Sequence, residues 1–151
     1  MKSINKKLFL LVAMVFMGVG FVLASCLDKS SSDASSLVQS EEILKTSKSW
    51  DGVDLPDYLT GKPEVRVLRV VIPPHCSLAR HHHDIMSYAV VTKGQLTIVR
   101  EADKKETTIN QGEPVVETVG TVHHGENRGE TTTELYVFYL SQEGLPLSVA
   151  D

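Results

Sequence analysis

From Glu64 onward the chain consists of short β-rich runs that are separated by turn-forming residues at close spacing. The runs are rich in Val, Ile, Thr, Tyr and Phe, and the breaks contain Pro-Pro, Lys-Gly, Gln-Gly and Asn-Arg-Gly. No stretch here carries apolar residues at helical spacing over a useful length. Many short strands with such breaks are typical of an antiparallel sandwich or barrel, so the sequence predicts an all-β fold. The predicted strands are Val65–Ile72, Met86–Thr92, Gln95–Glu101, Glu106–Ile109, Pro114–Thr118 and Glu134–Leu140.

The first residues read as a targeting segment rather than as part of this fold. Three lysines precede Leu8–Ala24, a run of 17 residues without charge, and this order is typical of a signal peptide. The run ends in the sequence LASC, which resembles the lipobox of bacterial lipoproteins and marks Cys26 as the lipidated first residue of the mature chain. A short single-span anchor is the alternative, because 17 apolar residues lie at the lower edge of what can cross a bilayer.

These features divide the chain into three parts. Residues 1–25 are predicted to be a lipoprotein signal peptide, residues 26–40 a lipidated serine-rich tether, and residues 41–151 the folded domain. We therefore expect an exported lipoprotein of the cell envelope. It would lie on the periplasmic face of an outer membrane or, in a cell with one membrane, on the outer face of the cytoplasmic membrane. The residue after the cysteine is Leu27, whereas an aspartate at this position is associated with retention in the inner membrane. The absence of that aspartate favours the outer membrane in a cell that has one.

Charge and cysteine content limit the partners and the means of stabilisation. The chain carries 15 Lys and Arg against 19 Asp and Glu, and loss of residues 1–25 would remove three lysines and no acid, leaving 12 minus 19, or −7. Such an acidic chain is unsuited to nucleic acid, whose phosphates require clustered Lys and Arg. With Cys26 acylated, Cys76 has no disulfide partner and is expected to be a small buried side chain.

The sequence HHHD at residues 81–84, together with His123, supplies the best candidates for metal ligands. Imidazole is the commonest protein ligand for transition metals. Residues i and i+2 of a strand share one face, so His81 and His83 would point inward while His82 points away. A third donor must then come from another strand, and His123 is the obvious candidate.

Continued past His83, the same alternation assigns residues 86–91 to two opposite faces. The inward set is Ser87, Ala89 and Val91, and the outward set is Met86, Tyr88 and Val90. Small inward side chains leave room for a ligand beside a metal ion. The apolar outward set indicates a covered surface, and we expect a homodimer.

Two sequence motifs resemble those of the cupins. The first cupin motif runs from a glycine through H-x-H and a glutamate to a second glycine, and its positions here are His75, His81, His83, Ser87 and Gly94. The second motif runs from a glycine through P-x-G and a histidine to an asparagine, and its positions here are Gly112, Thr118-Val119-Gly120, His123 and Asn127. The chain departs from the motifs at His75, at Ser87 and at Thr118. The resemblance extends over roughly residues 43–149.

The resemblance implies a cupin jelly roll, a double-stranded β-helix barrel of six to eight strands. It also implies that His81, His83 and His123 converge on one divalent transition metal near one mouth of the barrel. Iron, manganese, nickel and zinc are all compatible with such ligands. Because Ser87 stands where cupins carry a glutamate ligand, the expected site has three neutral ligands and water, and the ion keeps its full charge.

Three further residues are candidates for the surroundings of the metal. Ser87 either orients a bound water or fills space beside the ion. Glu117 either supplies the missing carboxylate or forms a salt bridge. Asn127 is expected to cap the turn after His123.

The expected function is that of an exported, lipid-anchored, metal-binding cupin. With iron it would be a dioxygenase-like oxidoreductase that acts on a small organic substrate. The alternative is a non-catalytic module of the envelope that binds a small molecule. No general base is identifiable in the motifs, so no catalytic residue is named. The expected partners are a small-molecule ligand or substrate, the membrane through the lipid, and a second copy of the chain.

Overall fold

The computed structural model of the protein describes residues 37–151, and residues 42–151 form one compact unit. The predicted signal peptide, Cys26 and the tether up to Ser36 lie outside the described residues. Residues 37–41 are exposed and belong to a separate unit. In the part of the chain that is described, no helix is long and apolar enough to cross a membrane.

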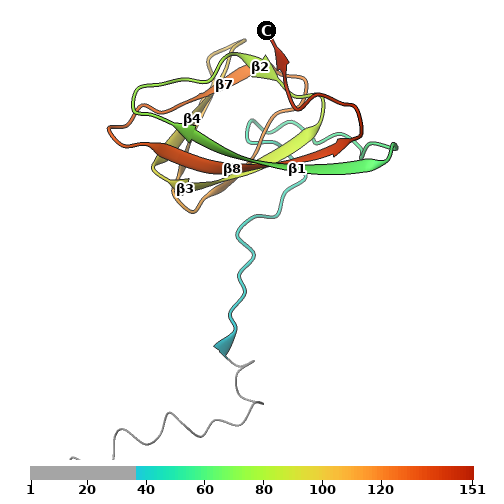
Figure 1. Ribbon diagram of the computed structural model, residues 1–151, viewed down its shortest axis with the longest axis horizontal. Helices are drawn as coiled ribbons and strands as arrows, with labels where there is room; N and C mark the ends of the chain where they lie inside the picture. The colour runs from blue at the N-terminus through green and yellow to red at the C-terminus, as the bar shows by residue number, and fades with distance from the viewer. Residues whose placement is uncertain (1–36) are drawn as a thin grey trace, which may run out of the picture. The chain divides into compact units, whose positions relative to one another are not determined.

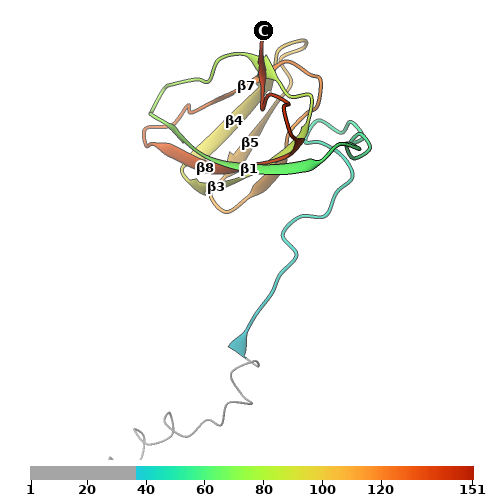
Figure 2. The same ribbon diagram turned by 45° about the vertical axis from the view of Figure 1, so that its right-hand side comes forward.

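The described residues form two antiparallel sheets that face each other (Figure 1). One sheet has the strand order β1-β8-β3-β6 and the other has the order β5-β4-β7-β2-β9. In the view turned by 45°, β4 and β5 of the second sheet lie across from β1, β3 and β8 (Figure 2). Neighbouring strands come from distant parts of the chain, as in a jelly roll, so the predicted all-β fold is confirmed. The strands are β1 (Pro63–Ile72), β2 (His81–His82), β3 (Met86–Lys93), β4 (Gln95–Arg100), β5 (Glu106–Asn110), β6 (Pro114–Val116), β7 (His123–Glu126), β8 (Thr133–Gln142) and β9 (Val149–Ala150).

The burial pattern of strand β8 shows which face of the first sheet is buried. Alternate residues of β8, from Thr133 to Ser141, are buried and those between them are not. The register places Tyr139 of β8 opposite both Arg66 of β1 and Ser87 of β3, so these three residues share the inner face. The inner faces of both sheets pack into one apolar core, and burial of each large side chain contributes about 1.5–3 kcal/mol. The core includes Ile72, Ile85, Ala89, Val91, Leu96, Ile98, Ile109, Val115, Leu135, Val137 and Tyr139.

All six predicted strands are present, with ends that differ by a few residues. The inward set is confirmed, because Ser87, Ala89 and Val91 are at most 1% exposed. Strands β2, β7 and β9 were not predicted, since runs of two, four and two residues are too short to show an alternation. The prediction for Cys76 is wrong: this residue is exposed in the connection between β1 and β2.

Two turns show why particular residues stand at the glycine positions of the first motif. Gly94, between β3 and β4, has a φ of +72°, and a Cβ there would lie 2.9 Å from the Thr132 carbonyl oxygen. Glycine is therefore needed at this turn. His75, at the position of the first motif glycine, has a φ of +58°. Histidine is among the side chains that adopt this conformation more often than most, but it does so with strain.

The segment before β1 is fastened to the barrel by Asp51. The Asp51 carboxylate is fully buried, and it accepts hydrogen bonds of 2.6 Å from the Ser49 hydroxyl and from Nη1 of Arg100 on β4. Lys105 Nζ donates a hydrogen bond of 2.7 Å to the Asp51 carbonyl oxygen. Burial by itself would raise the pKa of Asp51, but the Ser49 and Arg100 hydrogen bonds hold this pKa below its usual value.

Candidate metal centre

Three histidines converge inside one end of the fold: His81 and His123 lie on the paired strands β2 and β7, and His83 directly follows β2. Strands β2 and β7 pair with His81 opposite His123, and His83 follows two residues after His81. The ring centroids are 4.7 Å apart for His81 and His123, 4.8 Å for His81 and His83, and 5.2 Å for His83 and His123. One ring nitrogen of each lies within 4.8 Å of the others. The structure thus brings together the three histidines that the sequence singled out.

The Nδ1 atom of each of these rings lies at hydrogen-bond distance from a backbone carbonyl oxygen. The partner is Ala79 at 2.8 Å for His81, Leu147 at 2.7 Å for His83, and Thr121 at 2.8 Å for His123. A carbonyl oxygen only accepts, so each Nδ1 carries the proton and each neutral ring keeps its lone pair on Nε2. This arrangement orients metal-binding histidines in proteins.

The Nε2 atoms of His83 and His123 are buried and, within residues 37–151, have no hydrogen-bond partner. Leaving one buried polar atom without a partner costs about 1–3 kcal/mol. Two such atoms side by side are explained if both lone pairs are donated to a cation. The residues present therefore fit a divalent transition metal that is held by three imidazole nitrogens.

A carboxylate lies directly beside this group. Glu117 Oε2 is 3.2 Å from His83 Nε2, an ion-pair distance without hydrogen-bond geometry, and the Ser87 hydroxyl donates a 2.6 Å hydrogen bond to the same oxygen. Burial by itself would raise the pKa of Glu117, but the His83 ring in its protonated form and the Ser87 hydroxyl lower this pKa to about 2. Burial likewise opposes protonation of His83, yet Glu117 raises the His83 pKa. At His123, burial prevails and lowers the pKa.

Asn127 lies in the loop after β7 and is 2% exposed. Its amide nitrogen donates hydrogen bonds to the carbonyl oxygens of Ile72 at 2.9 Å and Thr131 at 2.8 Å, and its amide oxygen accepts one from the Gly129 backbone at 2.9 Å. These contacts hold the loop to the end of β1. Asn127 thus acts on the turn after β7, and its side-chain contacts are with this loop and with the end of β1 rather than with the histidine rings.

The neighbouring histidines take part in other contacts. His82 Nε2 is 3.5 Å from Asp84 Oδ1, and His124 Nδ1 is hydrogen-bonded to Glu101. Both side chains are partly exposed. His82 and His124 therefore do not join the cluster, although each is the sequence neighbour of a candidate ligand.

A sequence profile of the cupin domain matches residues 68–139, which include both motifs from His75 to Asn127 and all three clustered histidines. The chain belongs to the cupin superfamily. No curated protein matches this cupin in sequence. The chain departs from the first motif at two positions. His75 replaces a glycine and adopts a positive φ, and Ser87 replaces a glutamate and donates a hydrogen bond to Glu117, which follows β6.

The chain is similar to several solved structures. An oxalate oxidase in complex with the substrate analogue glycolate is 26% identical, with a TM-score of 0.50 over 57% of this chain and 45% of that chain. The DMSP lyase DddQ from Ruegeria pomeroyi is 14% identical, with a TM-score of 0.49 over 57% of this chain and 42% of that chain. A cupin 2 conserved barrel domain protein from Salinispora arenicola is 18% identical, with a TM-score of 0.47 over 58% of this chain and 71% of that chain. This cupin therefore spans less than half the length of either enzyme.

An open pocket of about 280 Å³ reaches the cluster at His81. Arg80, Tyr139 and Ser148 contribute polar groups to its lining, and Val70 is part of its apolar wall. The Tyr139 ring lies 5.6 Å from the His83 ring. Burial raises the pKa of Tyr139 to about 12, so its hydroxyl stays protonated at neutral pH. The cupin thus offers an open approach to His81, and the residues that line it include Arg80, Tyr139 and Ser148 beside apolar ones.

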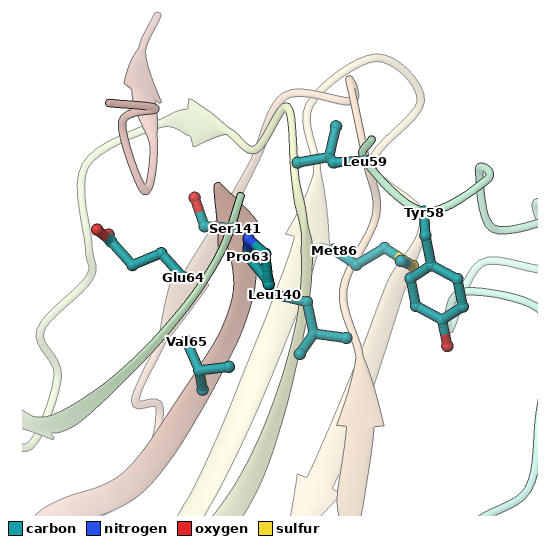
Figure 3. A pocket seen from close by; sticks show the side chains of 8 residues that line it. All are labelled: Tyr58, Leu59, Pro63, Glu64, Val65, Met86, Leu140 and Ser141. Atoms are coloured by element: carbon teal, nitrogen blue, oxygen red, sulfur yellow. The ribbon is translucent and has the colours of Figure 1, made fainter. Parts of the chain in front are cut away.

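A second cavity, of about 270 Å³, lies apart from the histidines. Figure 3 shows Leu59 above, and Tyr58 beside, Met86 and Leu140 of the first sheet; Tyr58 and Leu59 come from the segment before β1. Most of its lining is apolar, and none of the clustered histidines contributes to it. It is therefore no part of the candidate metal centre.

Sequence reasoning missed the contribution of the C-terminal segment. Leu147 orients His83 through its carbonyl oxygen, and Ser148 and Ala150 line the pocket. A carbonyl oxygen is present in every residue, so no sequence signal marks this one. Tyr139 could have been found, because the alternation along β8 places it on the inner face.

Proposed function

We propose that this cupin binds one divalent transition metal through His81, His83 and His123 and uses it to bind or transform a small organic molecule. The observation that carries the proposal is the pair of buried Nε2 atoms without partners, in rings whose Nδ1 atoms are fixed by carbonyl oxygens. A structural histidine cluster would be expected to use these nitrogens in hydrogen bonds.

The residues around the cluster would divide the work of binding and orientation. The three carbonyl partners hold the imidazole rings, and the pocket beside His81 holds the small molecule. Arg80 would attract an anionic group, and the Tyr139 hydroxyl would donate a hydrogen bond to it. The ion would supply Lewis acidity or, if it is redox-active, electron-transfer chemistry. The oxalate oxidase likeness favours small carboxylic acids among the candidates.

Metal content of the purified full-length protein tests this function. We expect one equivalent of iron, manganese, nickel or zinc in the wild type and a large loss in each of His81→Ala, His83→Ala and His123→Ala. His82→Ala and His124→Ala are matched controls, since each removes a neighbouring histidine that does not join the cluster. A wild-type protein that takes up none of these metals after refolding with them would reject the proposal.

A turnover assay then separates an enzyme from a binding module. For the enzyme we propose dioxygenase-like chemistry with iron, to be followed as oxygen uptake on oxalate, other small carboxylic acids, diketones, catechols, flavonols and thiols. Uptake that disappears in His81→Ala supports an enzyme. Saturable binding of one of these compounds to the metal-loaded protein, without turnover, supports the non-catalytic alternative.

We also propose that the chain is exported and held to a membrane by lipid on Cys26. The support is the order of lysines, apolar run and LASC sequence at residues 1–26. The test is the variant Cys26→Ser, which should leave the membrane fraction. A membrane fraction that is the same as that of the wild type would contradict lipid anchoring at this cysteine.

We further propose that the outer face of the β1-β8-β3 sheet is covered by a second copy of the chain. The register places Phe138 between Val67 and Tyr88 on this face, and the rings of Tyr88 and Phe138 stack at 5.1 Å. Val67 is 49% exposed and Tyr88 is 37% exposed, so this apolar row faces solvent in one copy. A twofold axis would bury the same row from both copies. Sedimentation should show a dimer that Val67→Lys converts to a monomer and that Thr108→Lys, at an exposed position of β5 in the other sheet, leaves intact.

A further inference from the structure

The glutamate position of the first cupin motif is occupied by Ser87, yet a carboxylate still lies at the histidine cluster. Ser87 is 1% exposed, and its hydroxyl donates a 2.6 Å hydrogen bond to Glu117 Oε2. Glu117 is the first residue after β6 and lies thirty residues further along the chain. A buried hydroxyl that contacts a buried carboxylate is not simply a small side chain that fills space.

The strand register explains how Glu117 reaches the place of the missing side chain. Strands β3 and β6 pair with Tyr88 opposite Val116, and Tyr88 faces outward. The next antiparallel pair is Ser87 and Glu117, which faces inward. The Glu117 backbone N–H donates a 3.0 Å hydrogen bond to the Ser87 carbonyl oxygen, so the pairing continues to this position. The two side chains are therefore cross-strand neighbours on the inner face.

The distance between the carboxylate and the nearest imidazole nitrogen matches two ligands of one ion. Glu117 Oε2 lies 3.2 Å from His83 Nε2. Two atoms that are each about 2.1 Å from one metal ion are separated by about 3.0 Å at a right angle and by about 3.4 Å at a tetrahedral angle. The observed separation lies within this range.

We propose that Glu117 is a fourth protein ligand of the metal centre, in place of the glutamate that the cupin motif carries at residue 87, and that Ser87 is its positioning residue. The inference rests on the proposed function, because it requires a metal ion at the three histidines. It replaces the neutral ligand set expected from sequence with one of charge −1. Such a set lowers the Lewis acidity of the ion and favours binding of a divalent cation.

Binding of Co²⁺ alone to the full-length protein tests this assignment, with affinity and visible absorption as the two measurements. Glu117→Gln keeps the shape of the side chain and should weaken Co²⁺ binding by more than about tenfold and change the absorption spectrum. Ser87→Ala should weaken Co²⁺ binding by about 10- to 100-fold, which is typical when a residue that hydrogen-bonds to a metal ligand is removed. Ser87→Thr keeps the hydroxyl and should therefore restore most of the affinity. Glu130→Gln is the matched control, because it removes an equal charge from a side chain that is 88% exposed.

The outcomes separate this inference from the function on which it rests. If His81→Ala abolishes Co²⁺ binding while Glu117→Gln keeps wild-type affinity and spectrum, the metal centre stands and the fourth ligand is rejected. If the wild type binds no metal, both are rejected. A crystal structure of the metal-loaded wild type provides a test that depends on no variant. Glu117 Oε2 at about 2.0–2.2 Å from the ion supports the assignment, and any position beyond bonding distance overturns it.

Discussion

His83 Nδ1 donates a hydrogen bond of 2.7 Å to the carbonyl oxygen of Leu147, sixty-four residues further along the chain. Leu147 also packs against the core, and β9 begins two residues later at Val149. Strand β9 pairs with β2, with Ala150 opposite His81. The last residues of the described chain therefore contact the candidate metal centre twice, once through a ligand ring and once through the strand that carries another ligand.

This relationship predicts that a short C-terminal truncation weakens metal binding. A chain that ends at Leu145 lacks the Leu147 carbonyl, so the His83 ring loses the partner that orients it. We expect a fall in metal affinity of about 10- to 100-fold, measured by titration with Co²⁺. A chain that ends at Ser148 is the control, since it loses β9 but keeps the carbonyl. Equal affinities for the two truncated proteins would show that the carbonyl does not matter.

A second prediction concerns the strained turn at His75, whose φ is +58°. Glycine relieves the strain of this backbone conformation, which costs other residues about 1–2 kcal/mol. Glycine also raises the conformational entropy of the unfolded chain, which lowers stability by about 0.4–1 kcal/mol. The variant His75→Gly should therefore raise the free energy of unfolding by about 0.5–1 kcal/mol in urea denaturation. The ion pair of His75 with Glu130 is exposed on both sides and its loss should matter little. A less stable variant would show that His75 is held by contacts stronger than this pair.

The fold and the three histidines of the cluster could be predicted, because both leave patterns in the sequence. The alternation from Ser87 to Val91 and the spacing of His81, His83 and His123 are visible in the sequence itself. For Glu117 the sequence left two roles open, because its position beside Ser87 depends on the register between β3 and β6, which a sequence does not state. Leu147 contributes a backbone atom, which no sequence signal marks.

A third prediction compares two glycines that both have positive φ. A Cβ at Gly94 would lie 2.9 Å from the Thr132 carbonyl oxygen and 3.0 Å from the Thr133 hydroxyl, whereas a Cβ at Gly112, with a φ of +87°, would have open space. Gly112→Ala should cost about 1–2 kcal/mol of stability through backbone strain alone. Gly94→Ala adds a clash with backbone that cannot move aside, so its cost in urea denaturation should be clearly larger. Equal losses would mean that the turn at Gly94 opens without penalty.

The last prediction is a dependence of stability on pH through Asp51. The pKa of this buried carboxyl is lower in the folded protein than its usual value of 3.8, so its ionised form stabilises the fold above that pH. The contribution is lost as the pH falls through the folded-state pKa. Asp51→Asn should lower the free energy of unfolding by about 1–3 kcal/mol at pH 7, because hydrogen bonds to a charged group are lost.

The difference in unfolding free energy between the wild type and Asp51→Asn should then begin to shrink as the pH falls below 3.8, because Asp51 of the unfolded chain takes up a proton there. It should be smallest below the folded-state pKa, where Asp51 is neutral in both the folded and the unfolded protein. Urea denaturation at pH 7, 5 and 3 measures this change. Asp54→Asn is the control within the same segment: its side chain is 80% exposed and pairs only with Lys48, so its effect should stay below about 0.5 kcal/mol at every pH. A constant difference between wild type and Asp51→Asn over this range would mean that the carboxyl stabilises the fold by its shape rather than by its charge.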